Sequence, residues 1–545
     1  MVPPTPSAHR DTFARDGLPP AEQWPELVTD LPELRYPRLL NCAHELLDTT
    51  IERYGADRPA LYDQDGREWS YARLRDRANR IAHLLVDDHG LVPGNRVLLR
   101  GPNSPWLVAC WLAALKAGAV VVTTMPLLRA GELKQITDRA QVQLALCEQD
   151  LTGELEAAGF PRARILTYTG ADGTDGGPAP LAADRSPHFT AVRTAADDVA
   201  LIAFTSGTSG EPKATLHFHR DVLAIADTFS AHVLRPDPDD VFIGSPPLAF
   251  TFGLGGLVVF PLRAGASAVL LEKAPPDALF RAVERHRASV LFTAPTAYRK
   301  ALDGIKDYDL SSLRRCVSAG EALPAWVWRA FHDATGLRII DGLGSTEMLH
   351  IFISAADDDI RVGATGRPVP GFRARVVDEG GAELPDGTPG RLAVQGPTGC
   401  RYLSDERQRT HVRDGWNITG DIYIRDTEGY FWYQARSDDM IVTSGYNVAA
   451  PEVEQAVIRH PAVADCGVVG VPDDERGALV KSYVVLAPGH SPSGQLAKDI
   501  QEFVKATIAP YKYPRLVEFV TALPSSATGK LQRSVLRDSV MARSA

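Results

Sequence analysis

Strand and helix signals alternate early in the chain, and this alternation limits the fold more than any other feature. Residues 96–99 read as a strand, 105–115 as a buried helix and 119–124 as another strand. Ahead of them, 59–62 looks like a short strand, and Ser70 is a suitable cap for a following helix. Strands and helices at this spacing are typical of an α/β fold with a largely parallel sheet. A chain of 545 residues is longer than a single hydrophobic core usually spans, so we expect at least two domains.

The pattern changes in the second half of the chain. Short β-like runs between turn clusters over 361–429 predict a small antiparallel region. A new α/β unit of about a hundred residues follows, with a helix over 451–459, strands over 466–471 and 481–486, and a helix near 496–508. The predicted organisation is an N-terminal body over 1–435, a hinge over 436–439 and a small α+β lid domain over 440–545.

Charge and apolar patterning exclude several classes of protein. The 58 Lys and Arg against 68 Asp and Glu give a net charge of −10, which argues against a nucleic-acid or anionic-membrane partner. The most apolar stretch, 106–123, is interrupted by Lys116 and Gly118, and the N-terminus lacks the apolar run of a secretory signal. The six cysteines lie far apart, so we expect reduced, mostly buried thiols, with neither a disulfide framework nor a metal site. A cytoplasmic location is the expectation, and the oligomeric state stays open.

A loop rich in glycine and hydroxyl groups follows the buried-strand run 201–204. It reads Thr205, Ser206, Gly207, Thr208, Ser209, Gly210, Glu211, Pro212 and Lys213. Such a loop turns backbone N–H and side-chain O–H groups toward phosphate oxygens, and a lysine adds a positive charge. It differs from the loop of nucleotide triphosphatases, because Pro212 precedes the lysine and no Ser or Thr follows it. The alternative is an ordinary Gly/Ser turn after a strand.

Five further segments of the sequence bear on how this loop is interpreted. They are Ser318-Ala319-Gly320-Glu321, Asp341-Gly342-Leu343-Gly344-Ser345-Thr346-Glu347, Thr419-Gly420-Asp421, Arg436-Ser437-Asp438 and 524–530, which ends in Thr528-Gly529-Lys530. With the loop, and in this order, they resemble the motifs of the adenylate-forming superfamily of acyl-CoA synthetases, adenylation domains and luciferases. The stretches 11–27, 216–230 and 245–256 resemble aryl-CoA ligases, particularly 2-aminobenzoate–CoA ligases.

The resemblance implies a role for each motif. Lys530 is the catalytic lysine of the adenylation step, Thr346 donates to the α-phosphate, and Glu347 binds Mg²⁺. The implied adenine site comprises Ser318, Ala319, Gly320, Glu321, Asp341, Gly342 and Leu343. Asp421 and Arg436 serve the ribose and phosphates, Asp438 is the pivot of a mobile lid, and Gly445 and Tyr446 approach the pantetheine tunnel. Without the resemblance, each motif has an ordinary alternative. Lys530 would be a solvated lysine, Ser345-Thr346-Glu347 a helix cap, Thr419-Gly420-Asp421 a turn, and 436–439 a charged linker.

An acyl pocket is expected along 246–256. Phe252 takes the position of an aromatic residue that gates the carboxylate in the family, and Phe250, Thr251, Gly253 and Gly255 are the other candidates. The alternative is an aromatic stripe in the core, since such residues are usually buried. His217 and His219 are expected to be structural histidines.

Two positions depart from the family pattern. Leu343 stands where an aromatic residue usually stacks on adenine, and Val442 follows Ile441 where the family commonly has a lysine that belongs to the thioester-forming pose.

The predicted activity is ATP-dependent, AMP-forming activation of an aromatic carboxylic acid through an acyl-adenylate, followed by transfer to CoA. An amino-substituted benzoate is the expected acid, and ATP, Mg²⁺ and CoA are the expected cofactor, metal and co-substrate. Three alternatives stay open: a diazotase that activates nitrite for an aryl amine, an enzyme that loads a carrier protein, and a nucleotide-binding sensor without catalysis.

Overall fold

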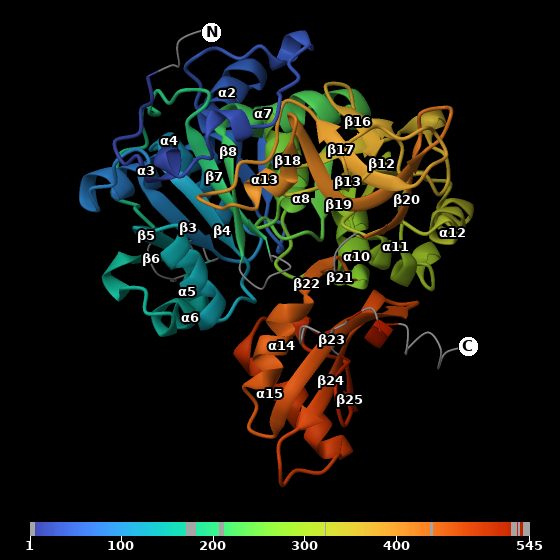
Figure 1. Ribbon diagram of the computed structural model, residues 1–545. Coiled ribbons are helices and arrows are strands. Elements are labelled where there is room, and N and C mark those ends of the chain that lie inside the picture. The colour runs from blue at the N-terminus through green and yellow to red at the C-terminus, as the bar shows by residue number, and fades with distance from the viewer. Residues whose placement is uncertain are drawn as a thin grey trace.

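The computed structural model describes residues 6–169, 181–205, 212–321, 323–436, 440–524, 531, 533 and 535–537. Figure 1 shows a large body built around two parallel-rich sheets and an antiparallel sheet, with a smaller C-terminal unit on one side of it. The predicted fold class, an α/β protein with a large body and a small C-terminal domain, is confirmed.

The first large sheet has six strands in the order β6-β5-β3-β4-β7-β8. Their bounds are β3 Arg96–Arg100, β4 Val120–Thr124, β5 Leu144–Glu148, β6 Ile165–Tyr168, β7 Val199–Thr205 and β8 Lys213–Phe218. The strands pair in parallel except β8, which runs antiparallel to β7. Helices α4 (Pro105–Lys116), α5 (Ala130–Arg139) and α6 (Thr152–Ala157) connect these strands. This is the βαβ arrangement that the early alternation predicts.

The second large sheet has nine strands in the order β15-β14-β13-β12-β11-β9-β10-β1-β2. Their bounds are β1 Pro59–Tyr62, β2 Glu68–Ser70, β9 Val241–Gly244, β10 Ser267–Val269, β11 Val290–Thr293, β12 Arg315–Ala319, β13 Ile339–Gly344, β14 Ile351–Ser354 and β15 Arg367–Pro368. Strand β1 pairs with β10, about two hundred residues away, although it precedes β3 in the sequence. Local patterning predicts that a strand forms, but not which sheet it joins.

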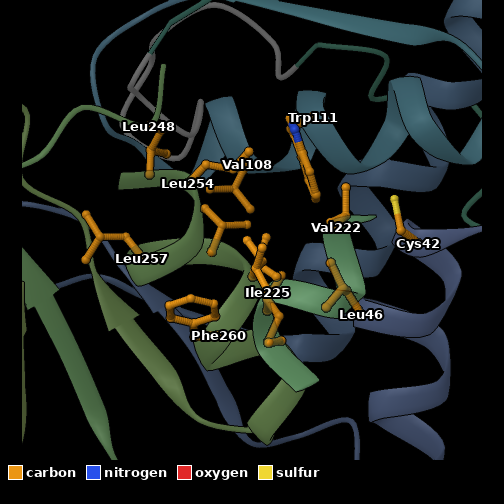
Figure 2. Close-up of a cluster of buried hydrophobic side chains, with 14 of the residues drawn as sticks. Cys42, Leu46, Val108, Trp111, Val222, Ile225, Leu248, Leu254, Leu257 and Phe260 are labelled. Carbon is orange, nitrogen blue, oxygen red and sulfur yellow. The ribbon is translucent and has the colours of Figure 1, made fainter. Parts of the chain in front are cut away.

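Helices pack between and around the two sheets. Helix α3 (Tyr71–His83) begins where predicted, because the Ser70 hydroxyl accepts a 3.2 Å hydrogen bond from the Arg73 amide. The others in the body are α1 Phe13–Asp16, α2 Thr49–Tyr54, α7 His219–Ile225, α8 Thr251–Leu254, α9 Phe260–Ala264, α10 Pro276–His286, α11 Pro295–Ala301, α12 Ala325–Thr335 and α13 Gln408–His411. Figure 2 shows part of the central core, to which Trp111 of α4, Ile225 of α7 and Phe260 of α9 all contribute.

The antiparallel sheet follows the two large ones in the sequence. Its strands are β16 Arg373–Val377, β17 Gly390–Gln395, β18 Val412–Arg413, β19 Trp416–Arg425 and β20 Phe431–Arg436. It confirms the predicted antiparallel region and extends a few residues beyond it.

The C-terminal unit, described over 440–524, has its own core. Its elements are the hairpin β21 Met440–Thr443 with β22 Tyr446–Ala449, the sheet β23 Val463–Asp473, β24 Gly477–Leu486 and β25 Leu516–Phe519, and helices α14 Ala450–Ile458 and α15 Gly494–Thr507. Both helices lie on one side of the β23–β25 sheet (Figure 1). Each element predicted for this part of the sequence is present within a few residues of its expected position.

All six cysteines are buried and free, as expected. Within the part of the chain that the structure describes, no cluster of three metal-ligating side chains occurs. No helix of the described residues has the length and apolar character needed to cross a bilayer.

Candidate active site

Two cavities adjoin where the body meets the C-terminal unit. Cavity A, of about 330 Å³, is lined by body residues that include Phe252, Thr346 and His350, and by residues 444–446 of the C-terminal unit. Cavity B, of about 1170 Å³, is lined by residues that include Asp341 and Asp421. Gly320 and Gly344 line both cavities. The predicted acyl pocket and the predicted adenine and ribose residues therefore fall into two neighbouring spaces with a shared border.

The phosphate loop lies at the tip of the β7–β8 hairpin. Thr205 ends β7 and lies opposite Lys213, which begins β8. Thr205 and Pro212, at the two sides of the loop, both line cavity A. The loop residues Ser206, Gly207, Thr208, Ser209 and Gly210 lie outside the described residues. The two described residues that flank the loop therefore lie at cavity A.

Strands β12 and β13 deliver the predicted adenine-binding segments. They are parallel neighbours, with Ala319 opposite Gly342. Gly320 follows β12 with a φ of +93°, a conformation that favours glycine, and lies at the border of the cavities. Ser318, expected to bind adenine, does not line either cavity, because it is fully buried and its hydroxyl has no partner among the described residues. Side chains alternate along a strand, so Ser318 faces away from the space that Ala319 borders.

Two carboxyl groups face cavity B from these segments. Oε2 of Glu321 accepts a 2.7 Å hydrogen bond from the Thr296 hydroxyl, and burial raises the pKa of Glu321. Oδ1 of Asp341 is buried without a partner among the described residues, and burial raises the pKa of Asp341 to about 8. At neutral pH Asp341 is therefore mostly a neutral acid that has hydrogen-bonding capacity available. Leu343 also lines this cavity.

The segment after β13 brings Thr346 and Glu347 beside Lys213. Thr346 lines cavity A, and Oε1 of Glu347 accepts a 2.5 Å hydrogen bond from the Tyr402 hydroxyl. Burial alone would raise the pKa of Glu347, but His411, Lys213 and the Tyr402 hydroxyl lower it to about 2. Burial lowers the pKa of His411 itself. An anionic carboxylate beside a lysine and a phosphate loop fits the ligand that Mg²⁺ prefers.

The two residues predicted for ribose and phosphate lie on neighbouring strands. Asp421 of β19 is directly opposite Arg436 of β20 in the antiparallel register. Asp421 lines cavity B together with Tyr423. Beyond β20 the described part of the chain resumes at β21, so the predicted pivot Asp438 lies outside the described residues, as does Lys530.

The predicted acyl segment forms one wall of cavity A, through Phe250, Thr251 and Phe252. Gly253 and Gly255, predicted to face the substrate ring, do not line the cavity. A β-carbon on Gly253 would lie 2.2 Å from the Pro247 carbonyl oxygen, and one on Gly255 would lie 2.3 Å from Cδ2 of His350. These glycines permit close packing behind the wall, which corrects their predicted role.

His350 occupies the space that Gly255 leaves open. Its ring lies 4.6 Å from that of Phe260 and 5.8 Å from that of Phe252, measured between centroids. Burial lowers the pKa of His350 to about 3, although the Phe252 backbone opposes that shift. Neither ring nitrogen makes a hydrogen bond of normal geometry to a described residue. A neutral imidazole therefore borders cavity A with hydrogen-bonding capacity available.

The C-terminal unit closes the other side of cavity A. Tyr446 stacks on Tyr511 with 4.3 Å between ring centroids, and it meets the Phe250 ring edge-on at 6.4 Å. A β-carbon on Gly445 would lie 3.6 Å from Cβ of Ala294, so this loop packs closely on the body. Gly445 and Tyr446, which are expected to approach the pantetheine tunnel, line cavity A.

Several residues of this region were missed by sequence reasoning. They are His350, Glu132 and Lys512, which line cavity A, and Tyr402, which bonds to Glu347; all four lie outside the recognised motifs, and only the fold brings them there. By contrast, His217 and His219 are fully buried, and burial lowers their pKa values to about 4 and about 3, as expected of structural histidines.

Comparisons with known proteins agree with this geometry. The family model described as AMP-binding enzyme matches residues 47–402, and the model of the AMP-binding enzyme C-terminal domain matches 452–530. These matches cover more than half of the sequence. The chain belongs to the AMP-binding enzyme family.

Relatives with known names are CoA ligases and an amide bond synthetase. A benzoate–CoA ligase of Thauera aromatica is 36% identical over 515 residues, which cover 93% of this chain and 97% of that enzyme. The anthranilate CoA ligase AuaEII, solved with anthranoyl-AMP, is 33% identical with a TM-score of 0.72, over 94% of this chain and all of that one. The amide bond synthetase McbA from Marinactinospora thermotolerans is 28% identical with a TM-score of 0.80, over 92% and 99%. The expected superfamily and the expected class, a ligase, are confirmed.

Proposed function

We propose that this enzyme activates an aromatic carboxylic acid with ATP, forming an acyl-adenylate and pyrophosphate, and then transfers the acyl group to CoA with release of AMP. The observation that carries the proposal is the shared border of the two cavities at Gly320 and Gly344. A carboxylate of an acid in cavity A and the α-phosphate of a nucleotide in cavity B would meet there, beside Thr346. The benzoate–CoA ligase and anthranilate CoA ligase relatives support an aromatic acid.

Several residues would stabilise the charge that moves during adenylation. Lys213 and the loop before it would hold phosphate oxygens, and Thr346 would donate a hydrogen bond to the α-phosphate. Glu347 would hold Mg²⁺, which supplies positive charge to the phosphates when it is bound. Asp421 would accept hydrogen bonds from the ribose hydroxyls, and Lys530 would bring a second cation to the reacting carboxylate.

An amino-substituted benzoate is the substrate that we favour. Phe250 and Phe252 give cavity A an apolar wall for a ring, and His350 adds one polar group without a partner among the described residues. A pocket that offers a hydrogen bond discriminates strongly between ligands that make it and ligands that do not. The neutral imidazole at that wall would accept a hydrogen bond from a ring amine.

A different acceptor is the second candidate. Val442 lines cavity B at the position where the family commonly has a lysine of the thioester-forming pose. An amide bond synthetase is among the solved structures with this fold, which supports an amine as an acceptor. The carrier-protein alternative changes the acceptor, and the diazotase alternative changes both the activated group and the acceptor. In each case the body still binds ATP and forms the adenylate.

The decisive experiment measures pyrophosphate release over benzoate, the aminobenzoates, the hydroxybenzoates and cinnamate. Each acid is offered alone and with CoA, an amine or a carrier protein, and nitrite is offered with an aryl amine. We expect the highest kcat/KM with an aminobenzoate and a thioester product with CoA. Pyrophosphate release with nitrite and no acid would favour the diazotase. Absence of pyrophosphate release with every acid would overturn acid activation.

A further inference from the structure

An ion-pair cluster joins the body to the C-terminal unit at the edge of cavity A. Nζ of Lys512 lies 2.6 Å from Oε1 of Glu132 and 2.6 Å from Oε1 of Glu452. Glu132 belongs to helix α5 of the body, whereas Glu452 belongs to α14 and Lys512 to the short turn Pro510–Lys512. The Ala509 amide also donates a 3.0 Å hydrogen bond to Oε2 of Glu132. We call Glu132, Glu452 and Lys512 the interdomain cluster.

The interdomain cluster is buried, which makes its contacts strong and specific. The side chains of Lys512, Glu132 and Glu452 are 6%, 11% and 16% exposed. Removing one partner of a buried ion pair is strongly destabilising, because it leaves an uncompensated charge away from water, whereas breaking an exposed pair costs little. The hydrogen bonds from the Ala509 amide and the Lys512 ammonium both end on Glu132, so this carboxylate is the anchor of the cluster on the body.

The cluster is connected to the wall of cavity A through neighbouring rings. Tyr511 precedes Lys512 and stacks on Tyr446, which in turn meets Phe250 at the cavity wall. Glu132, Glu452, Tyr511 and Lys512 themselves line cavity A. Fixing Lys512 on Glu132 therefore also fixes Tyr446 against the body.

We propose that Lys512 and Glu132 are positioning residues for the acyl-transfer step: their ion pair holds the pose in which Gly445 and Tyr446 close cavity A. The inference rests on the proposed two-step reaction. This pose is assigned to transfer because Gly445 and Tyr446, which the family resemblance places at the pantetheine tunnel, line cavity A in it. The contact between Lys512 and Glu132 exists only in this pose, so it contributes nothing to a different pose of the C-terminal unit used for adenylation. An internal contact, like a ligand, shifts the equilibrium between two poses only if it is stronger in one pose than in the other.

The test separates the two half-reactions. Enzyme, ATP and 2-aminobenzoate are mixed without CoA to measure the pyrophosphate burst, and CoA is then added to measure thioester formation from the bound adenylate. We expect Lys512→Met and Glu132→Gln to slow the second step by about 10-fold or more, as a lost charge-assisted hydrogen bond implies. The burst should be unchanged or faster. Lys512→Arg should recover most of the transfer rate.

Two matched variants control for ion-pair loss that does not involve the interface. Lys481→Met breaks a 2.7 Å pair with Glu518 inside the C-terminal unit. Glu154→Gln breaks the 2.8 Å pair with Arg129 at the start of the same body helix that carries Glu132. Neither should change the ratio of the two rates. Equal slowing of both steps in Lys512→Met and Glu132→Gln would overturn the proposal.

Hydrogen exchange provides a readout that does not depend on activity. The Ala509 amide is protected by Glu132 only in this pose, so it should exchange faster in Lys512→Met and in Glu132→Gln than in the two controls. Unchanged exchange of this amide would overturn the positioning role even if the enzyme is active. A failure of acid activation in the wild-type enzyme would instead show as an absent pyrophosphate burst, with the exchange result standing by itself.

Discussion

The Tyr402 hydroxyl donates a 2.5 Å hydrogen bond to Oε1 of Glu347, and the ring of the same tyrosine lies 5.4 Å from Nζ of Lys213. Tyr402 is fully buried and forms an isolated backbone bridge with Thr215 of β8. One side chain thus links the carboxylate proposed to hold Mg²⁺ with the hairpin that carries the phosphate loop.

Replacement of Tyr402 tests this link. Tyr402→Phe removes the hydroxyl and leaves the ring, so Glu347 loses its donor and its orientation. A hydrogen bond to a charged group contributes about 1.5–3 kcal/mol, so we expect Mg²⁺ affinity to fall by about 10-fold or more. Titration of Mg²⁺ by calorimetry in the presence of AMP, and pyrophosphate release against Mg²⁺ concentration, measure it. Tyr430→Phe is the control, because that hydroxyl donates to the Asp359 carbonyl away from the cavities. Equal Mg²⁺ affinity in the wild type and Tyr402→Phe would contradict the link.

His350 is expected to set the preference for a ring substituent. His350→Leu keeps an apolar wall and removes both ring nitrogens, so kcat/KM for 2-aminobenzoate should fall about 10-fold relative to benzoate. The ratio of the two values is the measurement. Phe229→Leu serves as the control, since Phe229 packs on His350 at 5.5 Å without lining cavity A. A parallel loss for both acids would show that His350 only fills space.

Asp341 should make stability depend on pH. Because burial raises its pKa to about 8, the folded protein holds a proton that the unfolded chain loses near pH 4. The contribution of this group is therefore greatest at low pH and is lost as the pH rises toward 8. The Tm of Asp341→Asn minus the Tm of the wild type should rise from pH 5 to pH 8 and then level off. Nucleotide-free protein followed by calorimetry gives this difference, and a constant gap would rule out a protonated Asp341.

Lys530 lies outside the described residues, and its proposed role is confined to the first half-reaction. Lys530→Ala should abolish the pyrophosphate burst, because the positive charge at the reacting carboxylate is lost. A chemically prepared acyl-adenylate supplied with CoA should still give thioester at nearly the wild-type rate. Comparable losses in both half-reactions would contradict a role in adenylation alone.

Much of the fold follows from local patterning. The strand over 96–99, the helix over 105–115 and the strand over 119–124 appear as β3, α4 and β4, and Arg373–Val377 appears as β16. Strands β3 and β4 and helix α4 are buried along almost their whole length, so the signal is an apolar run of the right length, which is contained in the segment itself. The pairing of β1 with β10 is not contained there, because it depends on residues far away in the sequence.

The residues of the candidate site likewise fall into those that the sequence predicts and those that depend on distant parts of the chain. A motif that adjoins a strand end reaches the cavities through that strand, as Thr346 does after β13. The resemblance places Ser318, Gly253 and Gly255 at the ligand. The direction of the Ser318 side chain depends on strand alternation, and the space beside Gly255 is filled by the packing of His350. Tyr402 and Lys512 were not identified, because their partners Glu347 and Glu132 lie 55 and 380 residues away.

The border formed by Gly320 and Gly344 separates two walls of different origin. One wall of cavity A comes from residues 250–252 and His350, none of which lines cavity B, whereas a wall of cavity B comes from Asp341, Gly342 and Leu343 of β13 and from β19, none of which lines cavity A. Mutations in the first set leave the second untouched. During evolution, the range of accepted acids in such an enzyme is free to drift while its ATP site is inherited unchanged.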